Sequence, residues 1–292
     1  MIFNQSASPP GGKNWSLQGF KDFAATITDP REKEIAEFAF FAGMQIIPPR
    51  KHIVALIHGI NTDAEWQERL AIQIRTDCGL DAYPIGYGNY RPTHFLNPYW
   101  DSRKGPIELV TRQLRTLKAQ HPDSDISIIA HSFGTYIISK ILSECPDLEF
   151  HRLQLCGSVV NEHFRWELVK SRVKQVVNDV GTRDIWPILA KQSTWFYGDS
   201  GAFGFKNVSL RDRHFDYAHS DFMSDSHFNQ YWKPLLVDGQ VIDSTWTKHR
   251  TTAGKSIAVL RRLPIKYLLW AGLIPGIAVS VIWALQFGVS RL

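Results

Sequence analysis

The stretch that decides the fold covers residues 126–135 and reads Ile126-Ser127-Ile128-Ile129-Ala130-His131-Ser132-Phe133-Gly134-Thr135. Its first half is rich in β-branched residues and continuously apolar, which is typical of a buried parallel strand. A helical pattern of apolar residues begins directly after the serine, with Tyr136, Ile137, Ile138, Ile141 and Leu142. The sequence therefore predicts a strand, a tight turn at Ser132 and a helix.

Small residues flank the serine on both sides, since Ala130 and Gly134 occupy the two glycine positions of the pattern Gly-x-Ser-x-Gly. In that pattern the serine lies on a strained turn between a strand and a helix, with the helix N-terminus beneath it. With these residues the chain resembles the serine esterases and lipases of the α/β-hydrolase fold. The alternative is a strand-to-helix turn of another parallel-sheet protein, in which Ser132 only caps the helix.

The resemblance implies an α/β fold of the α/β-hydrolase type, with a mostly parallel central sheet and helices on both faces. We expect this catalytic domain at residues 48–247, after an N-terminal region, residues 1–47. That region should hold a poorly ordered lead-in and one helix that begins at Asp29 and Pro30, either packed on the domain or serving as a lid. Further strands are expected at 52–58, 82–85, 153–160, 173–177 and 207–215, and further helices at 64–76, 106–120 and 226–236.

The remaining members of a catalytic triad should follow the serine in the order acid, then histidine. Residues 181–187 resemble the family's Gly-x-x-Asp followed by apolar-x-Pro, which assigns the acid role to Asp184. Asp179, nearer the strand end, stays open as an alternative. The base is expected in the loop 216–222 between the last strand and the final helix, where His219 lies; His214 and His227 are less suitable alternatives.

Two backbone N–H groups should form the oxyanion hole that stabilises the tetrahedral intermediate. The resemblance maps one to Phe133, directly after the nucleophile. It maps the other to Ile60, with Asn61 as the alternative, because His58 and Gly59 stand at the end of an early apolar strand. We expect His58 itself to be structural. The aromatic segment 87–100 either lines an apolar acyl pocket or packs on its own side chains.

The charge distribution argues against a nucleic-acid partner. The net charge is +5, but seven of the 33 Lys and Arg residues and none of the 28 Asp and Glu residues lie at or after Lys248. The remainder therefore has a net charge of −2, where a nucleic-acid binder would carry a basic folded surface. Three widely spaced cysteines (Cys78, Cys145, Cys156) favour a reducing compartment, and no ligand spacing predicts a metal or cofactor.

The C-terminal tail has the composition of a membrane anchor. Residues 267–289 form a stretch of 23 uncharged residues, and a bilayer span needs about 20. A basic juxtamembrane linker, residues 248–266, precedes it, so the positive-inside rule predicts a single-pass protein whose catalytic domain is cytoplasmic. A buried soluble helix is the alternative. Small residues at every fourth position (Gly272, Gly276, Ser280, Ala284, Gly288) could bring two such helices together as a homo-oligomer.

These observations predict a membrane-anchored serine hydrolase that cleaves an ester through Ser132, Asp184 and His219. The anchor favours a lipid or acyl ester as the substrate, and we expect no cofactor. Two other functions stay open, a catalytically silent α/β-hydrolase scaffold at the membrane and an effector that disrupts membranes through its tail.

Overall fold

A computed structural model describes residues 17–43, 51–60, 65–88, 92–95, 101–206, 209–268 and 271–272. The chain divides into two compact units, Met1–Arg50 and Lys51–Leu292. In the first unit, helices α1 (Leu17–Ala24) and α2 (Pro30–Gly43) pack on each other, and the rings of Phe20 and Phe40 stack with centroids 3.7 Å apart. The prediction that everything before Asp29 is a lead-in was therefore wrong at α1. A helix of eight residues is not stable alone, and α1 gains its stability from α2.

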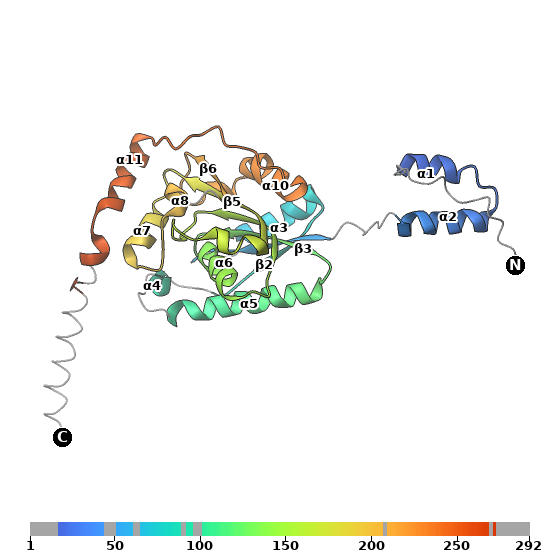
Figure 1. The fold of residues 1–292 in the computed structure, drawn as a ribbon. Coiled ribbons are helices and arrows are strands. Elements are labelled where there is room, and N and C mark those ends of the chain that lie inside the picture. The colour runs from blue at the N-terminus through green and yellow to red at the C-terminus, as the bar shows by residue number, and fades with distance from the viewer. Residues whose placement is uncertain are drawn as a thin grey trace, which may run out of the picture. The chain divides into compact units, whose positions relative to one another are not determined.

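The second unit contains one parallel sheet of six strands in its described part, in the order β2-β1-β3-β4-β5-β6 (Figure 1). The strands are β1 (His52–Ile57), β2 (Asp81–Ile85), β3 (Asp125–His131), β4 (Phe150–Cys156), β5 (Val173–Gly181) and β6 (Arg211–Phe215). Each pair of neighbours is parallel, as the resemblance implied. Parallel strands place all their carboxyl ends at one edge of the sheet, where ligands bind in such folds.

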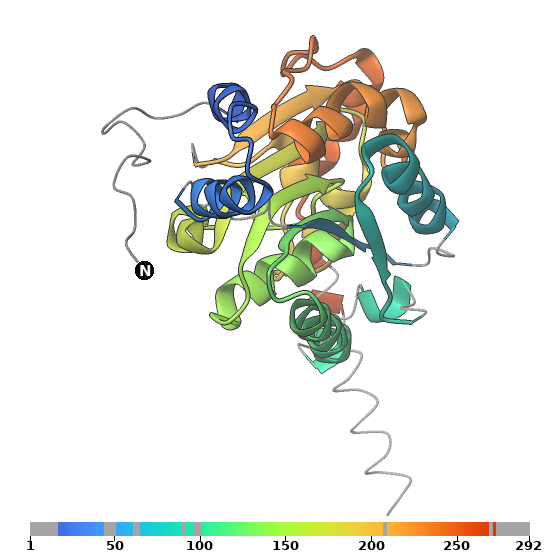
Figure 2. The ribbon, with the colours of Figure 1, turned by 90° about the vertical axis from the view of Figure 1, so that its right-hand side faces the viewer.

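Helices cover both faces of this sheet, as predicted (Figures 1 and 2). On β1, Ile53, Ala55 and Ile57 belong to the core that includes α5 and α6, whereas Val54 and Leu56 belong to the core that includes α3 and α10. This alternation is the period of two of a strand buried on both sides. The helices of the unit are α3 (Glu65–Cys78), α4 (Pro92–Phe95), α5 (Asp101–Gln120), α6 (Phe133–Glu144), α7 (Trp186–Ser193), α8 (Ser200–Phe203), α9 (Asp225–His227), α10 (Lys233–Asp238) and α11 (Thr252–Val259).

The C-terminal region is described only in part. Residues 252–259 of the expected linker form α11. The expected membrane span, residues 267–289, lies almost wholly outside the described residues. Among the helices that are described, none combines the length and the hydropathy needed to cross a bilayer.

Candidate active site

The turn at Ser132 has the strained geometry of a nucleophile elbow. Ser132 follows β3, precedes α6 and has φ 54° and ψ −123°. Among the described non-glycine residues it is the one with positive φ. Such a conformation costs about 1–3 kcal/mol and persists where neighbours enforce it. Here the Ser132 N–H donates to the Cys156 carbonyl at 3.0 Å, and the Ser132 carbonyl accepts from the Thr135 hydroxyl at 2.6 Å.

The loop after β1 packs directly against the elbow because two glycines leave room for it. A Cβ on Gly134 would lie 2.6 Å from the Ile57 carbonyl oxygen, and one on Gly59 would lie 2.7 Å from Ser132 Cβ. The Tyr87 hydroxyl bonds the His58 and Gly59 carbonyls at 2.9 and 2.6 Å and so fixes the loop. Gly59 thus lies against Ser132, and Ile60 is the next residue in the chain. Asn61 lies outside the described residues.

His58 takes a structural position, as expected. Its ring stacks on that of Tyr87 with centroids 4.1 Å apart, and its Nδ1 hydrogen-bonds the Gly59 carbonyl. Burial lowers the pKa of His58, so the ring is held neutral. The His58 imidazole is therefore uncharged and hydrogen-bonded to the backbone of its own loop.

Asp184 and His219, assigned as acid and base from the sequence, are brought together by the fold. Asp184 lies three residues beyond β5 and is fully buried, and its Oδ2 accepts a hydrogen bond from His219 Nδ1 at 2.8 Å. Its Oδ1 accepts from the backbone N–H of Trp186 at 3.0 Å. The His219 side chain stays 16% exposed. The two bonds fix the carboxylate, and the bond at Nδ1 orients the His219 ring.

His219 and Ser132 flank the same end of β4. The Ser132 N–H is bonded to Cys156, and a Cβ on the next residue, Gly157, would lie 2.8 Å from His219 Cε1. Gly157 has φ +56° and no room for a side chain, so glycine is required there. The ring of His219 also packs on that of His131, the residue before the serine, with centroids 4.5 Å apart.

His131 is a site residue that the sequence reasoning missed. Its Nε2 donates to the backbone carbonyl of His219 at 3.0 Å, and its side chain is buried. Burial and the neighbouring His219 lower the pKa of His131 to about 3, so the ring is neutral at physiological pH. The available signal was its position at the buried strand end, next to the nucleophile.

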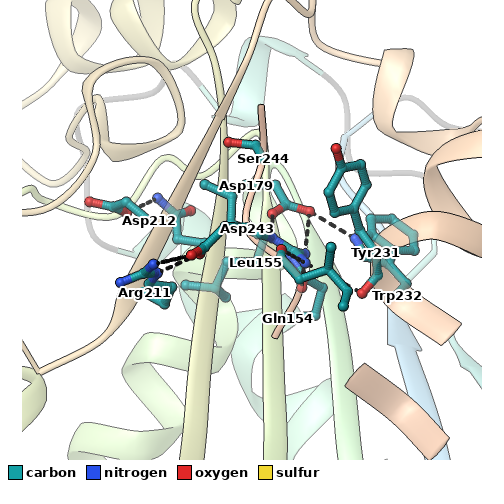
Figure 3. A network of polar contacts seen from close by, with 12 residues as sticks. Gln154, Leu155, Asp179, Arg211, Asp212, Tyr231, Trp232, Asp243 and Ser244 are labelled. Atoms are coloured by element: carbon teal, nitrogen blue, oxygen red, sulfur yellow. Dashed lines mark hydrogen bonds and ion pairs between the residues drawn. The ribbon is translucent and has the colours of Figure 1, made fainter. Parts of the chain in front are cut away.

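The alternative acid, Asp179, lies in a separate buried network (Figure 3). Its carboxylate pairs with Arg213 at 2.6 and 3.0 Å and accepts from His227 Nε2 at 2.9 Å and Trp232 Nε1 at 2.8 Å. Burial alone would raise the pKa of Asp179, but Arg213 and His227 outweigh it and hold the pKa below its ordinary value. The alternative base His227 is thus joined to the alternative acid, and His214 lies within β6.

The surroundings of the site include a cavity of about 690 Å³ beside the His219 loop, lined in part by Trp66, His131 and Tyr217. Phe95, which belongs to the aromatic segment 87–100, is buried and stacks on Tyr197 with centroids 4.5 Å apart. Phe95 thus packs in the core. Much of that segment, residues 89–91 and 96–100, lies outside the described residues.

Comparison with known proteins finds distant structural likenesses. No family model matches the sequence, and no curated protein matches it significantly. Among solved structures, it is similar to an alpha-beta serine hydrolase homologue from Coxiella burnetii, with 14% identity and a TM-score of 0.40 over 65% of this chain and 85% of that one. It is also similar to a cutinase-like protein from Cryptococcus sp., with 11% identity and a TM-score of 0.31 over 75% of this chain and 90% of that one. Neither likeness carries an activity over to this chain.

Proposed function

We propose that this chain is a serine hydrolase that cleaves an ester, with Ser132 as nucleophile, His219 as base and Asp184 as acid. The observation that carries the proposal is the 2.8 Å bond between His219 and Asp184, formed beside a serine in the strained elbow conformation. A serine hydroxyl is a weak nucleophile until a base takes its proton, and the base needs a carboxylate to fix its tautomer. The three side chains supply these roles.

The reaction proceeds through an acyl-enzyme. His219 Nε2 takes the proton from Ser132 Oγ as Oγ attacks the ester carbonyl carbon, and the N–H groups of Ile60 and Phe133 stabilise the oxyanion. The bond to the leaving alcohol then breaks, and His219 returns the proton to the alcohol oxygen. A water molecule, activated by the same imidazole, attacks the acyl group and releases the acid and free Ser132. Asp184 offsets the charge of the imidazolium in both halves.

The proposed location is a membrane surface. The uncharged stretch 267–289 is long enough for a bilayer span, and the basic residues before it favour a cytoplasmic catalytic domain. A tethered enzyme meets lipid or acyl esters at high local concentration, so we propose these as its substrates. The small-residue face of the span is the proposed contact of a homo-oligomer.

Labelling with a fluorescent fluorophosphonate tests the chemistry, because this reagent reacts covalently with activated serines. We expect the wild-type chain to be labelled and Ser132→Ala to be unlabelled. The control Ser143→Ala, which changes a serine within α6, should be labelled like the wild type. A folded wild-type chain without label would favour the silent scaffold. For the substrate, lipid profiles of cells that express the wild type or Ser132→Ala should differ; identical profiles with turnover of a soluble ester would contradict a lipid substrate.

A further inference from the structure

The segment that follows Lys248 is built into the catalytic domain. After α11, a short 3-10 turn (Leu260–Arg262) brings Arg261 to two buried carboxylates, Asp199 at 2.6 Å and Glu162 at 3.2 Å. Lys191 of α7 contacts the same two carboxylates. The two carboxylates are buried and the two basic side chains are 22% and 29% exposed, so these contacts attach the turn to the domain. We call Glu162, Lys191, Asp199 and Arg261 the ionic clamp.

Further bonds join this segment to α7 and α8, which lie next to α11 in Figure 1. The Gln192 side-chain amide donates to the carbonyls of Leu260 and Arg261 at 3.3 and 3.0 Å. The guanidinium of Arg250 bonds the Thr182 carbonyl at 2.5 Å and lies 4.0 Å from the centroid of the Phe203 ring. The chain as far as Arg262 is therefore fixed to the domain, so Leu263 begins at a defined point.

Exposed apolar side chains lie near that point. They come after α7 or after the 3-10 turn and are called here the aromatic patch: Trp195 (49% exposed), Phe196 (37%, with the Arg103 guanidinium over its ring at 4.4 Å), Leu263 (43%), Tyr267 (59%) and Leu268 (67%). The rings of Trp195 and Tyr267 have centroids 6.2 Å apart, and Lys266 Nζ lies 5.5 and 5.7 Å from those centroids. Exposed aromatic rings grouped with a lysine are the composition of proteins at the membrane–water interface.

Helix α7 connects this patch to the candidate active site. It begins at Trp186, whose N–H bonds Asp184 and whose ring centroid lies 6.2 Å from that of His219. It ends at Ser193, two residues before Trp195. Eight helical residues span about 12 Å, so the patch and the base lie at opposite ends of one short helix.

We propose that the aromatic patch rests on a lipid bilayer, and that the ionic clamp holds the active site at a fixed height above it. A lipid bilayer is the expected occupant because the patch includes Tyr267 and Leu268, the first two residues of the uncharged stretch 267–289. This inference rests on the membrane anchor of the proposed function. It adds that the domain sits on the bilayer in one orientation, with α7 between the lipid surface and His219.

Photo-crosslinking of the full chain in vesicles tests this surface. The vesicles are phosphatidylcholine with a small fraction of phosphatidylcholine that carries a diazirine near the headgroup, and crosslinked peptides are mapped by mass spectrometry. We expect crosslinks at Trp195 and Phe196 and in the tail, and none above background at Ile72 and Leu168, which are 58% and 62% exposed. Crosslinks in the tail without crosslinks at Trp195 and Phe196 would overturn the inference and leave the anchor intact.

Two neighbouring arginines provide a matched pair for the clamp. Arg261→Gln breaks the clamp, whereas Arg262→Gln removes the same charge from an exposed side chain. We expect Arg261→Gln to lower the crosslinks at Trp195 and Phe196 to the level of Ile72 while those in the tail persist, and Arg262→Gln to match the wild type. Equal crosslinking maps for the two variants would overturn the role of the clamp. Thermal unfolding reports whether Arg261→Gln folds. If it does not fold, the wild-type map still tests whether the aromatic patch contacts lipid. Ser132→Ala should give the wild-type map, so a failure of the proposed chemistry would leave this test standing.

Discussion

Asp184–His219 and Asp179–His227, both in the second unit, are aspartate–histidine pairs with nearly equal bond lengths and very different surroundings. Asp184 and His219 are joined at 2.8 Å, and Asp179 and His227 at 2.9 Å. The His219 side chain is 16% exposed, whereas both side chains of the second pair are fully buried. Bond geometry alone therefore does not distinguish the two pairs; access and the other partners of each carboxylate do.

The hydrogen-bond and ion-pair partners of Asp184 and Asp179 differ in charge. The Asp184 carboxylate accepts from one backbone N–H and one imidazole, and no arginine or lysine among the described residues forms an ion pair with it. The Asp179 carboxylate faces the buried guanidinium of Arg213, and its Oδ2 also accepts from Trp232. A carboxylate already neutralised by arginine has little to offer a developing imidazolium. In the proposed mechanism the first pair acts in catalysis, whereas the second pair joins β5 and β6 to residues 227–232.

The largest expected effect concerns the first pair. In Asp184→Asn the amide no longer fixes the His219 tautomer or offsets its charge, so kcat should fall by about 10⁴-fold. The free energy of unfolding should change by less than about 2 kcal/mol, since one hydrogen bond is exchanged. Hydrolysis of a p-nitrophenyl ester and urea unfolding measure the two quantities. A variant that kept most of its kcat would show that Asp184 is not the acid.

The second pair should respond in the opposite way. Asp179→Asn leaves the Arg213 guanidinium buried without its carboxylate, and we expect a loss of about 3–5 kcal/mol in the free energy of unfolding. The kcat of the molecules that remain folded should stay of the same order as that of the wild type. Urea unfolding and active-site titration with a fluorophosphonate measure these effects.

The adjacent pair Arg211–Asp243, drawn in Figure 3, gives the control for Asp179→Asn. It also joins an arginine of β6 to an aspartate, but the two side chains are 58% and 62% exposed. Asp243→Asn should therefore leave both stability and kcat almost unchanged, because exposed ion pairs are screened by water. If Asp179→Asn instead abolished kcat without loss of stability, the roles of the two pairs would have to be exchanged.

The smallest expected effect concerns His131, which packs on the first pair. The pKa of His131 is about 3 in the folded chain against 6.5 in the unfolded chain, so only the unfolded chain gains this proton as the pH falls between those values. Stability should thus be fully present above pH 6.5 and fall by about 1.4 kcal/mol per pH unit towards pH 3 for each such histidine. In His131→Gln the unfolding free energy should fall less steeply with decreasing pH, by about 1.4 kcal/mol per pH unit, which corresponds to one proton. Urea unfolding at pH 4 to 7 measures this slope. An unchanged slope would mean that the pKa of His131 is not lowered in the folded chain.

Much of the fold could be predicted because its signals are local. The apolar runs of β1 and β3, the apolar spacing of α3 and the small residues around Ser132 each specify their own element. By contrast, α1 is too short to be stable alone and depends on the contact of Phe20 with Phe40. Likewise, α11 is held to the domain through Arg250 and the ionic clamp, whose partners lie 48 to 99 positions away in the chain. No pattern within either segment contains that information.

The sequence by itself determined the elbow, the order of serine, acid and histidine, and the uncharged tail. It left two aspartates five positions apart as candidates for the acid, because both lie near the end of the same expected strand. Only the tertiary structure shows how their partners differ: the register of β5 against β6 places Asp179 opposite Arg213, while Asp184 lies beyond the strand end and reaches His219. The physical reason is that strand and helix formation depend on neighbours in sequence, whereas the partner of a buried charge is set by which strands lie side by side.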